Sequence, residues 1–317
     1  MSDHGGSRAV IAALGSNLGI ALIKFVAFAI TGSASMLAEG VHSVVDSGNQ
    51  GLLLIGGRSA RRRATPEHPF GYGRDRYVFS FLVALMLFTG GGLFALYEGI
   101  QKIRKPHRLD SPLIAIIVLG VAVVLEGVSL RTAVRESRPH KGADNWVAFV
   151  RHAKIPELPL VLLEDVAALV GLTLAFAGVG LAAVTGQRFW DGVATAGIGA
   201  LLIAVAIVLV IETKSLLVGE AAAPAQVAAI AAQLIGPGVD RVIHLRTMHL
   251  GPDELLVGAK LAMPEAATLA QVAAAIDAAE ARVRGAVPSA RVIYLEPDLD
   301  RAQAEEPATG TPRSPAT

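Results

Sequence analysis

The chain up to residue 211 consists of six long apolar stretches, separated by segments that hold most of its polar residues. A helix of about 20 predominantly apolar residues is long enough to cross the hydrocarbon core of a bilayer. The pattern therefore predicts six transmembrane helices, at residues 9–30, 36–57, 77–100, 112–132, 158–184 and 190–211. We expect residues 9–211 to form one α-helical transmembrane domain, preceded by a short cytoplasmic tail at residues 1–8.

After residue 211 the apolar positions become periodic over short segments, as in a water-soluble domain. The predicted elements are a helix at 225–234, strands at 241–249 and 254–262, a helix at 269–283 and a strand at 291–295. This αββαβ order predicts a small cytoplasmic α+β domain of the ferredoxin-like kind at residues 212–300, with helices covering one sheet face. Residues 301–317 are rich in Pro, Ala, Thr and Glu, which is typical of a disordered tail.

The distribution of Lys and Arg between the connections predicts how the chain is oriented. The second connection holds Arg58, Arg61, Arg62, Arg63, Arg74 and Arg76, and the fourth holds Arg135, Arg138, Lys141, Arg151 and Lys154. The first and fifth connections hold only Arg188, whereas the third opposes the trend with Lys102, Arg104, Lys105 and Arg108. Because Lys and Arg accumulate in cytoplasmic loops, the majority of the connections predicts that both termini are cytoplasmic.

Composition narrows the class of protein further. Hydrophobic residues make up 53% of the chain and charged residues 17%, which indicates an integral membrane protein. The absence of cysteine excludes disulfides, thiolate metal sites and cysteine nucleophiles. A net charge of +1, without a basic face and interleaved aromatic residues, gives no sign of nucleic-acid binding. The chain contains neither H-E-x-x-H nor G-x-S-x-G, so we expect neither an enzyme nor a bound prosthetic group.

Titratable side chains interrupt the apolar stretches at a few positions. On insertion scales a charged residue at the bilayer centre costs about 2.5–3.5 kcal/mol, so such residues rarely lie there without a function. His42 and Asp46 are four residues apart and share one helix face, while Glu164 and Asp165 adjoin each other in the fifth stretch. Imidazole and carboxylate groups that face a bundle interior can bind a divalent metal or a proton. Glu126, in the fourth stretch, is predicted either to relay protons or to pair with a basic group.

These motifs resemble those of the cation diffusion facilitator family of divalent-metal/proton exchangers. The resemblance covers about residues 8–297. It is carried by His42-Ser-Val-Val-Asp46, by the loop His68-Pro-Phe-Gly-Tyr-Gly-Arg74, by Asp165 and by Leu245-Arg246-Thr247 in the soluble domain. The histidine–aspartate spacing alone is weak, but its combination with six spans, the loop and the C-terminal domain is specific.

The resemblance implies a tetrahedral transport site with two ligands from the second helix and two from the fifth. His42, Asp46 and Asp165 match three of these ligands. The fourth position is Val161, and valine cannot bind a metal. Glu164, about 100° around the helix from Asp165, or a water molecule would then complete the site. The Glu164-Asp165 pair resembles a divergent branch of the family that includes a mitochondrial zinc transporter.

Two further metal sites of the family are incomplete in this chain. In the loop His68 matches a ligand, but Tyr72 stands where a second histidine is usual. In the soluble domain His244 and Glu296 are candidate ligands, whereas Lys260 and Tyr294 stand at other ligand positions. We therefore expect no dinuclear metal cluster there, and the soluble domain is predicted to fold without metal. The resemblance also implies a homodimer in which the C-terminal domains pair.

The predicted function is export of a divalent metal from the cytoplasm in exchange for protons, in the bilayer of a bacterial inner membrane. Nitrogen and oxygen ligands without sulfur suit Zn²⁺, Co²⁺, Mn²⁺ or Fe²⁺, and one imidazole with carboxylates favours tetrahedral Zn²⁺. Two alternatives stay open. One is an exporter of iron, manganese or cobalt, and the other is a metal-sensing membrane scaffold that has lost transport.

Overall fold

A computed structural model of the chain describes residues 7–31, 34–105, 112–187 and 189–299. The chain forms two compact units, of which the first is residues 1–219 with 250–252 and the second is residues 220–249 with 253–317. The predicted tails at residues 1–6 and 301–317 lie outside the described residues. Ser7 and Arg8, which the sequence assigns to the N-terminal tail, already belong to the first helix.

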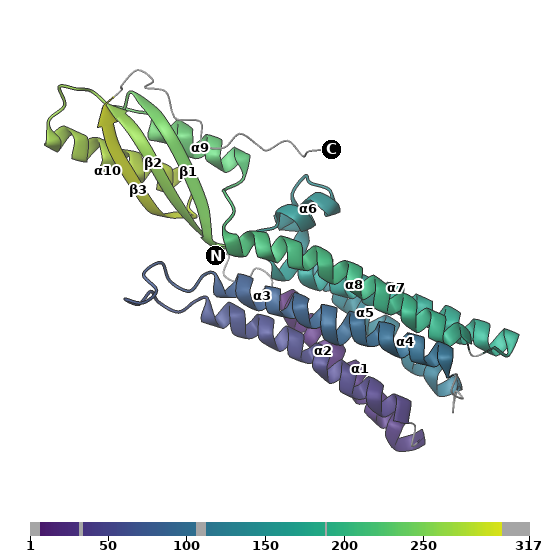
Figure 1. Cartoon of the computed structure of the whole chain (residues 1–317). Coiled ribbons are helices and arrows are strands. Elements are labelled where there is room, and N and C mark those ends of the chain that lie inside the picture. The colour runs from purple at the N-terminus through teal and green to yellow at the C-terminus, as the bar shows by residue number, and fades with distance from the viewer. Residues whose placement is uncertain (1–6, 32–33, 106–111, 188, 300–317) are drawn as a thin grey trace, which may run out of the picture. The chain divides into compact units, whose positions relative to one another are not determined.

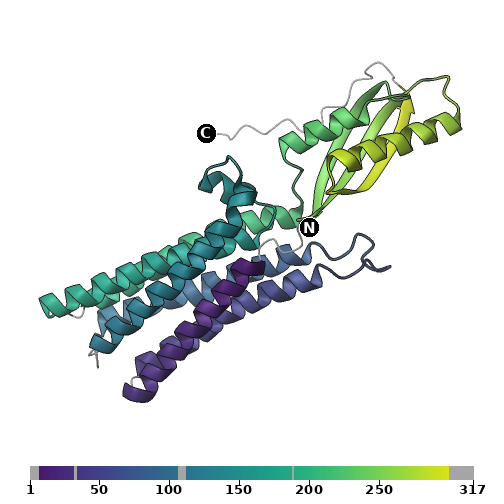
Figure 2. The ribbon, with the colours of Figure 1, turned by 180° about the vertical axis from the view of Figure 1, so that it is seen from behind.

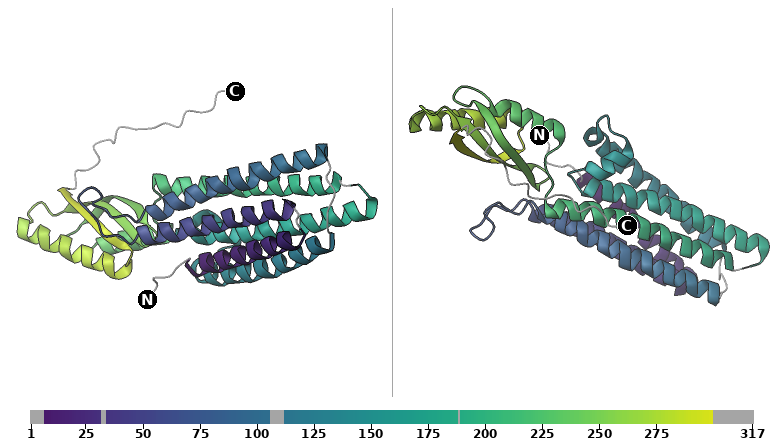
Figure 3. Two further views of the ribbon diagram at one scale, coloured as in Figure 1. Left: turned by 90° about the horizontal axis from the view of Figure 1, so that it is seen from below. Right: turned by 45° about the horizontal axis from the view of Figure 1, so that its top comes forward.

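The first unit is a bundle of long helices that run alongside one another (Figures 1 and 3). Its elements are α1 (Ser7–Thr31), α2 (Ala34–Ser59), α3 (Asp75–Met86), η1 (Leu87–Leu93), α4 (Phe94–Arg104), α5 (Pro112–Lys141), α6 (Trp146–His152), α7 (Glu157–Thr185) and α8 (Phe189–Val218). The segment η1 is a π-helix that connects α3 directly to α4, so these three elements form one continuous rod. The rod corresponds to the third predicted span.

Within the described residues, five helical runs are long and apolar enough to cross a membrane: Ser7–Ile30, Asp75–Arg104, Ile116–Lys141, Glu157–Ala182 and Phe189–Val218. They correspond to five of the six predicted spans. The remaining helix, α2, has 26 residues and packs against α1 and α3. Its polar residues, among them Asp46, Asn49 and Gln50, lower its mean hydropathy. The chain therefore has a helical membrane domain, and the sixth span stays a prediction.

Hydrogen bonds between helix ends bring the predicted basic connections to one end of the bundle. Arg76, at the start of α3, donates from Nε and Nη2 to Glu157 Oε1 and Oε2 at the start of α7, at 2.6 and 2.9 Å. This bidentate, charge-assisted pair is largely buried, which makes it strong and geometrically specific. The backbone amide of Ala9 in α1 donates to Glu136 near the end of α5. The starts of α1, α3 and α7 and the end of α5 thus share one end.

Glycines allow the α3–α4 rod to lie very close to α8. A Cβ atom added at Gly99 would lie 2.4 Å from the backbone nitrogen of Ala196, and one at Gly199 would lie 2.4 Å from that of Leu96. Neither position can accommodate a side chain without moving the helices apart. Small residues commonly serve this role at helix contacts in membranes, where tight packing replaces the hydrophobic effect.

The last helix of the bundle is longer than the hydropathy of its sequence predicts. α8 continues to Val218, whereas the sixth apolar stretch ends at residue 211. The residues that follow, Glu212, Thr213 and Lys214, are polar but still helical, because hydropathy indicates the lipid-facing length and not the end of the helix. The two units divide after Gly219, later than the predicted boundary at residue 212.

The second unit has the predicted αββαβ order around a three-stranded sheet. Its elements are α9 (Pro224–Leu234), β1 (Arg241–Gly251), β2 (Glu254–Met263), α10 (Leu269–Ala286) and β3 (Ala290–Leu299). The strand order is β1-β2-β3, and β2 pairs with β3 in parallel, with Val257 opposite Ile293. Both helices cover the same sheet face (Figure 2). The ferredoxin-like assignment of this small α+β domain stays a prediction.

The core of the second unit forms between the sheet and its two helices. Along β2 the buried residues alternate, with Leu255, Val257 and Leu261 facing the helices, and they pack against Ile230 of α9 and Val283 of α10. This period-two pattern is that of a sheet with one covered face. The apolar core explains how the unit can fold from its own side chains.

Candidate metal centre

A band of buried polar side chains crosses the interior of the helical bundle. It includes Ser43, Ser47, Asn49 and Gln50 on α2, Glu126 and Ser129 on α5, and Asp165 on α7. Polar groups removed from water are costly unless they find partners, and a bilayer offers no water at this depth. The band is therefore the place in the bundle where binding chemistry is expected.

On α2 the polar side chains recur every three or four residues. Ser43, Asp46, Ser47 and Gln50 therefore lie on one side of the helix, and Asp46 is half-buried. His42, one turn before Asp46, belongs to the same helix, but its side chain lies outside the described residues. Its predicted approach to Asp46 stays a prediction from helical periodicity.

Gln50 links three helices through its side-chain amide. Asn17 Nδ2 of α1 donates to Gln50 Oε1 at 3.2 Å, and Gln50 Nε2 donates to Glu164 Oε2 of α7 at 3.0 Å. Gln50 is fully buried. The chain of hydrogen bonds therefore holds the Glu164 carboxylate toward α2. Sequence reasoning missed Gln50, although its position four residues after Asp46 on the same helix face was a usable signal.

Asp165 points to a different neighbour from Glu164. Ser129 Oγ of α5 donates to Asp165 Oδ2 at 2.8 Å, and both residues are buried. Adjacent residues of a helix project about 100° apart, so Glu164 reaches toward α2 while Asp165 reaches toward α5. The two carboxylates thus approach the centre of the bundle from the same helix in different directions. Ser129 is a second partner that sequence reasoning missed, although it lies three residues after Glu126.

Lys24 on α1 offsets part of the negative charge of these carboxylates. Lys24 Nζ of α1 donates to Ser43 Oγ at 3.0 Å, and it lies within electrostatic reach of the buried Glu126. Asp46 is in turn within electrostatic reach of both Glu126 and Glu164. Among the described side chains, the carboxyl groups of Asp46, Glu126, Glu164 and Asp165 thus lie in this region together with the ammonium group of Lys24. When ionised, they create a negative potential that attracts a divalent cation.

The side chains that the structure describes do not assemble a complete metal site by themselves. Among them no three His, Asp or Glu side chains converge closely enough to hold an ion. Val161, at the fourth ligand position implied by the family resemblance, is fully buried in the apolar core beside Leu160. A complete centre would therefore need His42, or a shift of Glu164 away from Gln50.

The loop between α2 and α3 holds His68 in an aromatic and cationic setting. The rings of His68 and Tyr72 stack with centroids 4.6 Å apart, and the guanidinium of Arg62 lies 4.4 Å from the Tyr72 centroid. An adjacent cation opposes the binding of a metal ion. His68, the predicted secondary metal ligand, instead packs against Tyr72 in this loop.

In the second unit Lys260 forms a salt bridge with Glu296, the candidate acidic metal ligand. Lys260 Nζ lies 2.9 Å from Glu296 and 3.2 Å from Asp298, and the hydrogen bonds that it donates to these carboxylates raise the pKa of Lys260 above its usual value. His244 is exposed on β1, and no ion-binding group of three is formed with it among the described residues. The ammonium group supplies the positive charge that a metal would bring.

Comparison with known proteins identifies the family to which the helical unit belongs. Residues 10–218 match the cation efflux transmembrane domain, which corresponds to nearly the whole helical unit. The mitochondrial proton-coupled zinc antiporter SLC30A9 of Homo sapiens is 33% identical over 223 residues, 70% of this chain and 39% of the human protein. Metal tolerance protein C4 of Arabidopsis thaliana is 30% identical over 223 residues, 70% of this chain and 49% of the plant protein.

A bacterial relative is similar over a greater length. The cation-efflux pump FieF of Pectobacterium atrosepticum is 27% identical over 303 residues, 92% of this chain and 94% of the pump. By contrast, the matched segment spans less than half of the human and plant relatives. Since the matched domain covers more than half of the chain, and His42, Asp46, the loop motif His68–Arg74 and Asp165 lie within it, the chain belongs to the cation diffusion facilitator family of cation efflux transporters.

Proposed function

We propose that this chain exports a divalent cation, with Zn²⁺ as the first candidate, from the cytoplasm in exchange for protons. The observation that carries the proposal is a group of acidic side chains on the apolar helices of the bundle, in which Glu126 and Asp165 are buried and Asp46 and Glu164 are half-buried. Metal binding needs ionised carboxylates and neutral imidazole, so metal ions and protons compete for the same atoms. A site that faces each side of the membrane in turn then couples their opposite flows.

The ligands that we propose are His42, Asp46 and Asp165, with Glu164 or a water molecule in the fourth position. The bond between Gln50 and Glu164 supports the water alternative, because Glu164 must leave this partner to bind metal. Glu126 is proposed as a proton relay, since it is buried near both Asp46 and Lys24. We propose His68, His244 and Glu296 only as candidate ligands of secondary metal sites.

The choice of metal follows from ligand chemistry. Imidazole and carboxylate ligands in a four-coordinate site suit Zn²⁺, and the human relative is named as a zinc antiporter. The same ligands also bind Fe²⁺, Mn²⁺ and Co²⁺, which are the alternative substrates. No prosthetic group is part of the proposal, and the partners are the metal ion, protons and lipid.

Orientation and assembly complete the proposal. We propose a bacterial inner membrane, in keeping with the bacterial relative that matches over nearly its full length. We infer that both termini are cytoplasmic, because the Arg-rich second and fourth connections lie at one end of the bundle. The proposed assembly is a homodimer paired through its α+β domains, as the family resemblance implies. Because the chain has no cysteine, crosslinking of single-cysteine variants would test the assembly, and labelling of such variants with a membrane-impermeant thiol reagent would test the orientation.

Transport into proteoliposomes tests the proposed function. Purified protein should move Zn²⁺ when a pH gradient is imposed, with opposite proton movement recorded by an internal dye, and Asp46→Asn should abolish both fluxes. A panel of Zn²⁺, Fe²⁺, Mn²⁺ and Co²⁺ identifies the substrate. Protein that binds these metals but moves none of them would contradict export and favour the metal-sensing scaffold.

A further inference from the structure

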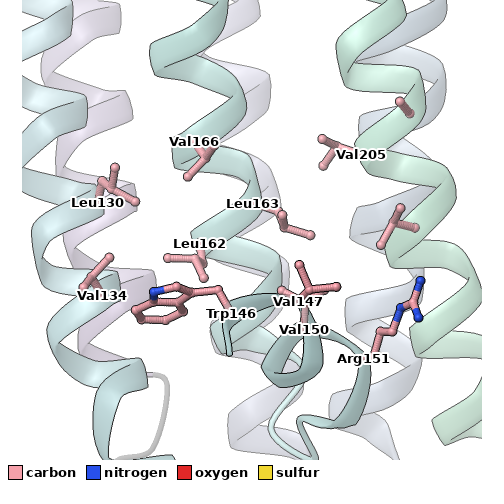
Figure 4. Close-up of a pocket in the computed structure, with 12 residues that line it drawn as sticks. Leu130, Val134, Trp146, Val147, Val150, Arg151, Leu162, Leu163, Val166 and Val205 are labelled. Atoms are coloured by element: carbon pink, nitrogen blue, oxygen red, sulfur yellow. The ribbon is translucent and has the colours of Figure 1, made fainter. Parts of the chain in front are cut away.

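An open apolar groove lies on the bundle. It has a volume of about 560 Å³ and is formed by α5, α6, α7 and α8 (Figure 4). This volume falls within the range of ordinary ligand pockets, roughly 300–1,000 Å³. Its walls are aliphatic, with Val134 on α5, Leu162 and Val166 on α7 and Val205 on α8. Such a lining suits a hydrocarbon chain.

The short helix α6 closes one end of the groove. Phe149 is buried beneath it and contacts Trp146 edge-on at 6.0 Å, which anchors the helix. Trp146 is partly exposed, and its indole lies in the groove toward Val134 (Figure 4). Trp is typical of the membrane–water interface, where one part of the ring is apolar and its N–H is hydrated. The α6 end of the groove is therefore expected at the level of the lipid headgroups.

Two cationic side chains flank this same end. Arg151 is an exposed lining residue whose guanidinium lies on the α8 side of the groove (Figure 4). Lys141 Nζ lies 5.5 Å from the centre of the Trp146 ring, on the α5 side. An apolar groove that ends between two cations matches a molecule with a hydrocarbon tail and an anionic head.

We propose that the groove binds an anionic phospholipid, with an acyl chain between α5, α7 and α8 and its phosphate near Arg151 and Lys141. A second copy of the chain is a poorer occupant, because each copy would bring the same two cations to the contact. A lipid without net charge would pack against the apolar walls but would bring no net negative charge to the two cations. The bound lipid contacts Leu162 and Val166, which flank Asp165 on α7, so its occupancy should stabilise the bundle.

Quenching of Trp146 fluorescence by brominated lipids tests the proposal directly. The chain has two tryptophans, so Trp190→Phe leaves Trp146 as the only reporter. The variant is reconstituted with dibrominated phosphatidylglycerol or dibrominated phosphatidylcholine, and relative binding constants come from the quenching curves. We expect phosphatidylglycerol to bind at least about fivefold better, from the effect of a basic residue near anionic lipid. Equal binding of the two lipids would overturn the proposal.

Two variants and a control test whether the lipid binds at the proposed position. Arg151→Gln should reduce the preference about fivefold, whereas Arg58→Gln, an exposed arginine at the end of α2, should leave it unchanged. Val205→Phe should reduce quenching by both lipids, because the larger ring occupies the groove. If Arg151→Gln keeps the full preference for phosphatidylglycerol, the assignment of the headgroup site is overturned. If neither lipid quenches Trp146, the proposal that the groove binds lipid is overturned. Thermal unfolding of each variant confirms that the fold is retained.

Discussion

At the scale of single residues, Glu164 and Asp165 of α7 have different surroundings and should contribute differently to metal binding. Asp165 accepts a hydrogen bond from a small hydroxyl, that of Ser129, whereas Glu164 already accepts one from the buried amide of Gln50. A serine hydroxyl can rotate to accommodate a metal ion, but Gln50 is also bonded to Asn17. We therefore assign Asp165 the larger role.

Metal affinity of three variants tests this assignment. Asp165→Asn should weaken Zn²⁺ binding more than about 100-fold, because it removes an anionic ligand. Glu164→Gln should weaken it about tenfold, in the range found for groups that support metal ligands. Calorimetric titration measures the affinities, and Glu98→Gln, an acid on α4 paired with Lys102, is the matched control. Unaltered affinity in Asp165→Asn would contradict the proposed site.

Sequence reasoning could find the charged residues of the band, but it could not identify their partners. A carboxylate such as Asp165 in an apolar stretch is conspicuous because charged residues are costly in membrane spans and therefore rare there. Its bond to Ser129, and that of Glu164 to Gln50, join residues 36 and 114 positions apart. Such pairs depend on how the helices pack. The position of the His42 side chain stays a prediction for the same reason.

At the scale of elements, the contact between the α3–α4 rod and α8 depends on glycine. Gly99→Ala should destabilise the bundle by about 1–3 kcal/mol, the usual cost of overpacking, because the new Cβ would meet the backbone of Ala196. Gly120→Ala is the matched control, since a Cβ there meets no atom within 4 Å. Thermal unfolding in detergent should show a lower Tm for Gly99→Ala alone. Equal Tm values would mean that the helices separate at little cost.

Hydropathy predicted the long helices but not the irregular elements. The π-helical turn η1 contains Gly90, Gly91 and Gly92, and apolar periodicity does not distinguish it from an α-helix. The helix α6 has only seven residues within a basic connection, so it is too short to produce a hydropathy signal. Its Asn145 side chain accepts from the Ala148 amide, and this N-cap was the available indication. The groove proposed to bind lipid depends on this short helix.

At the scale of the whole molecule, the two units have different sources of stability. The bundle places apolar side chains toward lipid and polar ones inside, and its helices depend on close packing. The α+β unit has a covered sheet face and an apolar core of its own. Its element order was predictable because strand and helix periodicities are local. Pairing of two such units is a property of an assembly and stays a prediction.

The α+β unit should fold without metal. Residues 220–299, expressed alone, should show cooperative thermal unfolding in the presence of EDTA, because Leu255, Val257 and Ile230 supply a buried core. Zn²⁺ should raise its Tm by little, since Lys260 already supplies a positive charge to Glu296 and Asp298.

The pH dependence of the same fragment distinguishes the lysine pair from a metal cluster. The pKa of Lys260 is raised by its hydrogen bonds to Glu296 and Asp298, so the stability from this pair is fully present below the ordinary lysine pKa. It is lost only as the pH rises through the raised value, and the pair should therefore contribute equally at pH 6 and pH 8. A zinc cluster would instead lose stability toward pH 6, as its histidine ligands protonate. Thermal unfolding at both pH values, with and without EDTA, measures the difference. A fragment that unfolds in EDTA and recovers with Zn²⁺ would show that the second unit is a metal-dependent domain.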